Sequence, residues 1–226
     1  MERLRIDTDI WEIPFDLKEF SRLMGFKQAL PTPFDGIFMK VSTTLETGTA
    51  RAEAIFFDAP EVDIECDKVV VKGVELHTGY KVAGWLRDCD EVVLFICTLG
   101  VEFEYRMKSF QADPIEGYFA DTIGSLKCEA FADMIHDRIG DVVKRTGLAV
   151  TNRYSPGYCH WDVEGQQALF SFFRDSQTGI TLNNSSLMSP LKSISGIVGT
   201  GKGAKRIPYA CSACADSEWC VWKTRP

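Results

Sequence analysis

The chain has 226 residues, of which 45% are hydrophobic and 25% charged, a composition typical of a globular protein with enough chain for one large domain or two very small ones. Its 32 acidic and 25 basic residues give a net charge of −7, which argues against nucleic acid as the main partner because phosphate binding needs a basic face. The longest apolar run, about 92–101, is too short to span a membrane, and the N-terminus lacks the apolar core of a signal peptide. We therefore expect a cytoplasmic protein that binds neither nucleic acid nor membrane.

The first hundred residues contain both helical and strand patterns. Asp16 can cap a short helix that Gly25 can end, and valines on either side of Gly73 indicate two strands joined by a tight turn. In chain order, we expect helices at 16–24, 38–57 and 80–88, a strand pair at 62–76, and a buried strand at 91–99.

The second half begins with a longer helical pattern. Pro114 suits a first helical turn, and an apolar stripe continues from it for about thirty residues until Gly147. After this helix we expect a strand at 148–153, a turn at 155–157, a helix capped by Asp162, short strands and turns over 180–199, and a mobile glycine-rich loop at 199–203. Helices and strands that lack regular βαβ alternation predict an α+β fold with a mainly antiparallel sheet.

The segment Arg153-Tyr154-Ser155-Pro156-Gly157-Tyr158 is the first candidate for chemistry. Pro156 and Gly157 nearly force a tight turn, with Arg153 at its start and Tyr158 at its end. An arginine fork suits a carboxylate and a tyrosine offers an aromatic face, so a ligand made of an amino acid and a base would use both. The alternative is an arginine that merely pairs with a surface acid.

Four segments, in order, resemble the activation domain of cobalamin-dependent methionine synthase. They are the helix Cys128–Arg138, the turn Arg153–Tyr158, Gly179–Leu182 leading into Ser186–Met188, and Ser193–Gly196. The resemblance covers roughly 115–209. Upstream of it, the segment Phe95–Gly100 resembles the corresponding segment of small stand-alone relatives of that domain. We therefore expect a single domain over 1–226 with a cysteine-rich tail at 210–226.

The resemblance implies a site for S-adenosylmethionine. By position in the family motifs, Arg153 would hold the ligand's carboxylate, Glu129 would contact its methionine end, and Pro156, Gly157 and Tyr158 would face the adenosine. The family also uses a later tyrosine, for which Tyr209 is the nearest candidate. An early aspartate of the family has two candidates here, Asp7 and Asp9. A solvated helix residue is the alternative interpretation of Glu129.

The chain departs from the family after Tyr158, where it continues Cys159-His160-Trp161-Asp162 in place of Pro-Ala-Cys-Pro, and in its cysteine-rich tail. The spacing of Cys211, Cys214 and Cys220 suits a metal site with three local ligands, to which Cys159 or His160 could add a fourth. Zinc and an iron–sulfur cluster both remain open, as do an intrachain disulfide and simple reduced thiols.

The function implied by the resemblance is reactivation of a corrinoid cofactor by methyl transfer from S-adenosylmethionine after one-electron reduction. The chain lacks the Asp-x-His-x-x-Gly signature of cobalamin binding, so the corrinoid would arrive on a partner, a cobalamin-dependent methyltransferase or corrinoid protein, with a flavodoxin-type reductant as electron donor. Two other interpretations are a metal-binding redox or interaction protein with a vestigial nucleotide site, and a module that senses S-adenosylmethionine without chemistry.

Overall fold

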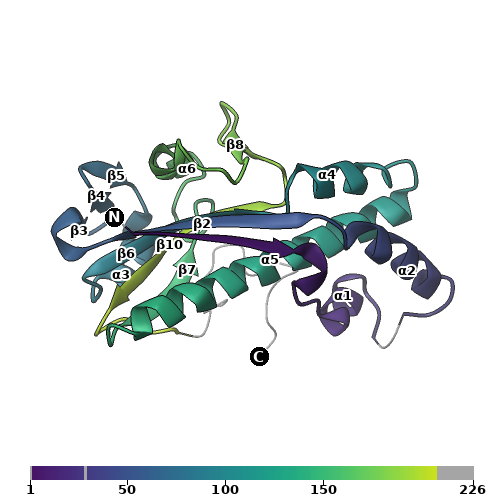
Figure 1. The fold of residues 1–226 in the computed structure, drawn as a ribbon, viewed down its shortest axis with the longest axis horizontal. Helices are drawn as coiled ribbons and strands as arrows, with labels where there is room; N and C mark the ends of the chain where they lie inside the picture. The colour runs from purple at the N-terminus through teal and green to yellow at the C-terminus, as the bar shows by residue number, and fades with distance from the viewer. Residues whose placement is uncertain (1, 28–29, 208–226) are drawn as a thin grey trace.

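A computed structural model of the chain describes residues 2–27 and 30–207. Its centre is a five-stranded sheet made of β1 (Arg3–Asp9), β2 (Thr49–Phe57), β6 (Glu91–Thr98), β7 (Ala149–Tyr154) and β10 (Ser193–Gly201). The strand order is β1-β2-β6-β10-β7, and every neighbouring pair is antiparallel. This sheet, with helices packed against it, confirms the predicted α+β fold (Figure 1).

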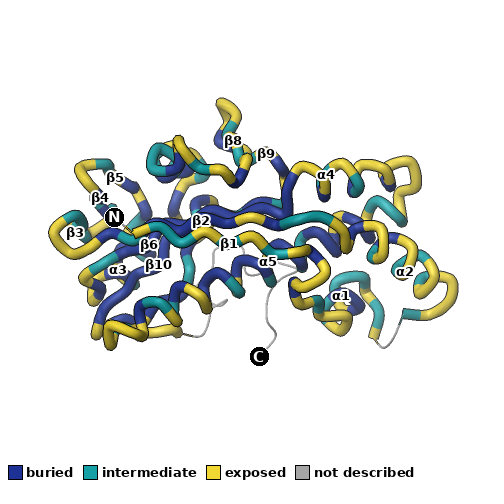
Figure 2. Tube along the Cα trace, viewed as in Figure 1, coloured by how far each residue is buried: buried dark blue, intermediate teal, exposed yellow. Residues whose placement is uncertain are grey.

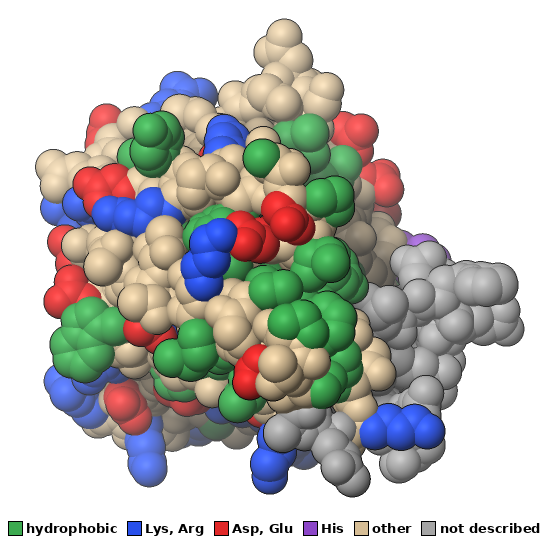
Figure 3. Space-filling view, turned by 90° about the vertical axis from the view of Figure 1, so that its right-hand side faces the viewer, with side chains coloured by type: hydrophobic (Ala, Val, Ile, Leu, Met, Phe, Trp, Pro, Cys, Tyr) green, Lys and Arg blue, Asp and Glu red, His purple; other side chains and the backbone are tan. Residues whose placement is uncertain are grey.

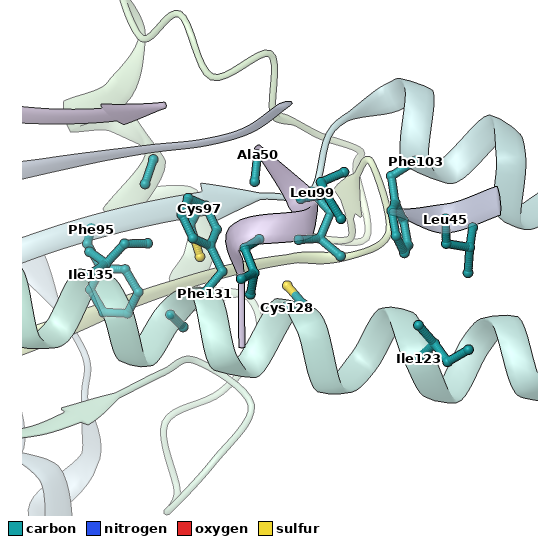
Figure 4. Close-up of a cluster of buried hydrophobic side chains, with 14 of the residues drawn as sticks. Leu45, Ala50, Phe95, Cys97, Leu99, Phe103, Ile123, Cys128, Phe131 and Ile135 are labelled. Atoms are coloured by element: carbon teal, nitrogen blue, oxygen red, sulfur yellow. The ribbon is translucent and has the colours of Figure 1, made fainter. Parts of the chain in front are cut away.

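One face of the sheet is covered by α5 (Pro114–Lys144), a helix of 31 residues. Figure 4 shows Phe95 and Cys97 of β6 above Cys128, Phe131 and Ile135 of this helix. All five side chains belong to the larger core cluster. The central strands of the sheet and the inner side of α5 are accordingly buried, whereas edge strand β1 and the outer side of the helix are more exposed (Figure 2).

Three short helices complete one end of this layer: α1 (Leu17–Leu23), α2 (Phe34–Leu45) and α4 (Val101–Lys108). A 3-10 helix, η1 (Ile10–Glu12), connects β1 to this group, and buried Lys127 of α5 donates to the carbonyl oxygens of Ile10 (3.1 Å) and Ile13 (2.7 Å). Apolar side chains gather among charged groups on the surface of this end (Figure 3). Among the described residues, no helix is both long enough and apolar enough to cross a bilayer.

A second core cluster lies on the opposite face of the sheet and includes Leu94, Trp161 and Leu169. The elements on this side are short. They are α3 (Gly79–Leu86), α6 (Gly165–Phe170), η2 (Ala59–Glu61), η3 (Ser171–Phe173), the three-stranded sheet β3 (Val62–Ile64), β4 (Val69–Val71) and β5 (Val74–Leu76), and the pair β8 (Thr181–Leu182) and β9 (Met188–Ser189).

Several sequence-based expectations are confirmed. Asp16 caps α1 by accepting hydrogen bonds from the backbone N–H groups of Lys18 and Glu19. The helix that begins at Pro114 has the expected length, and Gly147 follows it with a φ of +78°. The strand expected at 91–99 is β6, which is buried along nearly all of its length.

The expectation of one helix over 38–57 is wrong. Helix α2 ends at Leu45, the chain turns at Gly48 with a φ of +114°, and 49–57 form β2. Ala50, Ala52 and Ala54 favour a helix by intrinsic propensity, but their alternation has the period of a strand and they lie buried against α5. The tertiary context overrides the propensity.

Other boundaries also differ from those expected. Helix α6 begins at Gly165 with Glu164 at its N-cap position, so Asp162 does not cap it with its side chain. The segment 62–76 forms three strands, and 180–199 contains the start of the long strand β10.

The glycine-rich segment 199–203 does not begin as a mobile loop, because Gly199 and Gly201 are buried at the end of β10. A Cβ atom on Gly199 would lie 2.5 Å from the Cys89 sulfur, so the glycine lets the chain near Cys89 pack directly on the strand.

Candidate functional site

The structure brings Arg153, Glu129 and Asp133 together where edge strand β7 meets helix α5. The Arg153 Nη2 donates to Glu129 Oε2 at 2.5 Å and to Asp133 Oδ1 at 3.0 Å, and its Nε donates to the same Asp133 oxygen at 3.2 Å. The two acids are four residues apart on the helix, so they project from the same side. Only 13% of the Arg153 side chain is exposed, against 48% for Glu129 and 68% for Asp133. The result is a largely covered guanidinium flanked by two accessible carboxylates.

One further contact holds β7 against α5, and a second ties the same helix to the chain that follows β10. The His136 Nε2 lies 2.7 Å from the Thr151 carbonyl oxygen, and since a carbonyl can only accept, this nitrogen carries the proton. Burial, with the nearby charges of Arg206 and Arg153, lowers the pKa of His136 below its usual range. One turn along the helix from Asp133, Asp137 pairs with Arg206 at 3.0 Å. The backbone that carries Arg153 is therefore fixed on its helical side.

The turn after Arg153 has the conformation predicted from its proline and glycine. Gly157 has a φ of +93°, and its N–H donates to the Trp161 carbonyl oxygen at 2.7 Å. Trp161 is 1% exposed within the second core cluster, so it anchors the turn to the body of the protein. Pro156 is buried, whereas Tyr158 is exposed, which leaves an aromatic surface beside the turn.

The backbone becomes unusual where the sequence departs from the family pattern. Cys159 and His160 have φ angles of +55° and +68°, in the left-handed region that residues with a side chain rarely adopt. The His160 ring stacks on Tyr80 with centroids 5.5 Å apart, and a Cβ on Gly79 would come within 2.6 Å of the His160 carbonyl oxygen. This part of the loop is thus packed against the start of α3.

The segment Ser193–Gly196 lies in β10, beside the strand that carries Arg153, and its contacts described below are made with residues other than Arg153. The Ser195 hydroxyl donates to Gln166 Oε1 at 3.0 Å in a buried position. A Cβ on Gly196 would lie 2.6 Å from the Tyr154 carbonyl oxygen, so the glycine allows the close approach of β10 and β7. The motif therefore positions the strand on which Arg153 lies.

Sequence reasoning did not assign Asp133 a role, although its spacing of four residues from Glu129 was a usable signal. The two candidates for the family's early aspartate, Asp7 and Asp9, lie on β1, which is the edge strand at the opposite side of the sheet from β7. The structure thus unites the helix and turn motifs but does not bring β1 next to β7.

The expected metal ligands of the tail, Cys211, Cys214 and Cys220, and the candidate Tyr209 lie outside the described residues. Cys159 is described and is half-buried. Within 2–27 and 30–207, no group of three or more His, Cys, Asp or Glu side chains is arranged to hold a metal ion. The tail site stays a prediction from spacing.

Comparisons with known proteins bear on the family and the fold of the chain. The family model "Vitamin B12 dependent methionine synthase, activation domain" matches residues 85–219, which is more than half of the chain and includes both α5 and the turn. A solved structure described as "Crystal Structure of the MetH Reactivation Domain bound to AdoHcy" superposes with a TM-score of 0.64 at 16% identity, covering 93% of this chain and 81% of the other. No curated protein sequence matches the chain significantly. The chain belongs to the family of the vitamin B12 dependent methionine synthase activation domain.

Proposed function

We propose that this chain binds S-adenosylmethionine and supports the reductive methylation of a corrinoid cofactor carried by a partner protein. The observation that carries the proposal is the Arg153 guanidinium, held between α5 and β7 beside the Gly157 turn. It has the chemistry to bind a carboxylate next to an aromatic surface. The reactivation domain of similar fold was crystallised with AdoHcy, which has the same amino-acid and adenosine parts.

Each candidate residue receives a role in this proposal. Arg153 binds the ligand's carboxylate, because a planar fork matches two carboxylate oxygens. Glu129 contacts the methionine end. The adenosine lies along Pro156, Gly157 and Tyr158, where an exposed ring adjoins a turn with a positive φ.

We assign Tyr209 to the same site as the nearest candidate for the family's later tyrosine, at a spacing that differs from the family's. We further propose that residues 1–226 form a single domain. This is supported by the sheet, because β1 pairs with β2, and β2 pairs in turn with β6 from the rest of the chain.

The proposed reaction needs alignment more than proton transfer. The sulfonium methyl passes to the reduced corrinoid, the sulfur–carbon bond breaks, and the neutral thioether leaves without taking up a proton. Holding two reactants in line supplies effective molarities of about 10⁵ M or more. Because the chain has no cobalamin signature, methyl donor and acceptor reach each other only when the partner docks over the turn. A flavodoxin-type protein is the proposed electron donor.

Ligand binding gives the direct test. Calorimetry should detect AdoHcy and S-adenosylmethionine binding to the wild type. Arg153→Ala should weaken it by about 30-fold or more, because removing one side of a desolvated charge pair costs roughly 2–5 kcal/mol. Arg153→Lys should restore little, since a lysine cannot bind both carboxylate oxygens in the same fork. Equal affinity of wild type and Arg153→Ala would exclude Arg153 as the carboxylate ligand.

Methyl transfer gives the second test and separates reactivation from mere ligand sensing. The chain is mixed with S-adenosylmethionine, a reductant and a corrinoid protein from the same source, and the visible spectrum should change from cob(II) to methylcob(III) only in the complete mixture. The net charge of −7 favours a partner with a basic surface, so the rate should fall as salt rises. Equal rates without this chain would exclude reactivation.

The cysteine spacing of the tail favours a second function, metal binding with a redox or interaction role. We propose that Cys211, Cys214 and Cys220 share one zinc ion or iron–sulfur cluster, with Cys159 as the fourth ligand. Protein purified without oxygen should contain about one zinc per chain, or iron with sulfide. Cys214→Ser should abolish it, with Cys66→Ser as the control because Cys66 is an exposed cysteine outside the tail. Metal-free wild-type protein would rule this function out.

A further inference from the structure

The hydrogen bonds of Arg153 place both flanking acids on one nitrogen. The Nη2 donates to Glu129 at 2.5 Å and to Asp133 at 3.0 Å, while Nε donates only to Asp133 among the contacts described. A guanidinium can present two parallel N–H groups to a carboxylate either along the Nε and Nη2 edge or along the Nη1 and Nη2 end. Since both arrangements use Nη2, no ligand carboxylate can bind in the two-pronged manner until a resident acid leaves this nitrogen.

Asp133 is the acid that is easier to displace. Its contacts with Arg153 are longer than that of Glu129, and a single oxygen takes both of them. Its side chain is 68% exposed, so the displaced carboxylate returns to water at little cost. It also occupies the Nε and Nη2 edge, which is one of the two edges available to a ligand. Glu129, at 2.5 Å and less exposed, stays in place.

We infer that Asp133 is a specificity residue: it occupies the Arg153 fork in the free protein, yields to the ligand's carboxylate, and then accepts the ligand's α-ammonium group. This rests on the proposed function, since it concerns the same site. The exchange replaces one acid–guanidinium pair by two pairs of opposite charge, provided that the ligand is a zwitterion. A ligand with a carboxylate but no ammonium group displaces Asp133 from Arg153 and leaves the Asp133 carboxylate without a new cationic partner. The free protein therefore selects for an intact α-amino acid end.

The experiment compares two ligands by calorimetry: AdoHcy and its des-amino analogue, 5′-(3-carboxypropylthio)-5′-deoxyadenosine. They differ only in the ammonium group. Asp133→Asn removes the competing charge and the ammonium partner together. The matched control is Asp137→Asn, because Asp137 is one turn further along α5, is also 68% exposed and also pairs with an arginine, Arg206. Thermal unfolding of both variants checks that the fold is unchanged.

The expected result is a change in the ratio of the two affinities. In Asp133→Asn the des-amino analogue should bind about two- to fivefold more tightly than in the wild type, the range for an exposed ion pair, while AdoHcy should not gain. Asp137→Asn should leave the ratio at the wild-type value. AdoHcy binding with an unchanged ratio in Asp133→Asn would overturn this inference alone. A wild type that binds no AdoHcy would overturn the proposed function, and this inference with it.

Discussion

Gly196→Ala tests whether the close contact between β10 and β7 positions the site. The added Cβ would lie 2.6 Å from the Tyr154 carbonyl oxygen and 2.8 Å from Phe95 Cε1. Neither atom can move away easily, because the Tyr154 oxygen belongs to the backbone of a paired strand and the Phe95 ring is fully buried. Overpacking of this kind costs about 1–3 kcal/mol. In a chain of this length each kcal/mol lowers the Tm by roughly 2–4 °C.

The matched control is Gly84→Ala in α3, where an added Cβ meets nothing within 4 Å. Alanine should stabilise that helix by about 0.5–1 kcal/mol, so the two variants should shift urea and thermal unfolding in opposite directions. Because Tyr154 adjoins Arg153, Gly196→Ala should also weaken AdoHcy binding, whereas Gly84→Ala should not. If Gly196→Ala left both stability and affinity unchanged, β7 would not depend on this contact for its position.

Two other perturbations test how the layers are held together. Lys127→Met should destabilise the fold by about 2–3 kcal/mol in urea unfolding, because it leaves the buried carbonyl oxygens of Ile10 and Ile13 without their charged donor; unchanged stability would refute this. His136 has a folded pKa below its ordinary value of 6.5, so the unfolded chain takes up the proton first, and stability is lost as pH falls below about 6.5 toward the folded pKa. His136→Gln, which can still donate to the Thr151 carbonyl, should flatten the dependence of Tm on pH between about 7.5 and 5; an equal slope in both proteins would contradict this assignment.

The parts of the fold that the sequence predicts well are those whose pattern is long and unambiguous. The apolar stripe from Pro114 predicts α5 almost to its ends, and the β-branched run at 91–99 predicts β6. The turn at Pro156 and Gly157 was predictable because both residues restrict or permit particular backbone angles. These features depend on local chemistry, so a single sequence is sufficient to identify them.

The features that were missed depend on partners far away in the chain. The alanines of β2 have helical propensity but the alternation of a strand, and their pairing with β1 and β6 decides between the two. The role of Asp133 depends on Arg153, which is 20 residues away and on a different element. Likewise, the glycines at the end of β10 are understood only once Cys89 is found against Gly199. Such pairings are tertiary facts that spacing alone does not specify.

The family model and the likeness of fold cover different parts of the chain, and the structure gives a physical reason. The match to the family model begins at residue 85, whereas the match to the solved structure extends over 93% of the chain. The ion pairs of Arg153 and the close contact of Gly196 involve α5, β7 and β10, all of which lie after residue 85, and each depends on the identity of particular residues. Strand β2 supplies instead a buried surface of small side chains that packs against α5 through Ala50 and its neighbours, a task that many small apolar residues can perform. A packing surface of this kind tolerates changes of sequence better than an ion pair or a close glycine contact does, so the likeness of fold can extend further along the chain than the family pattern.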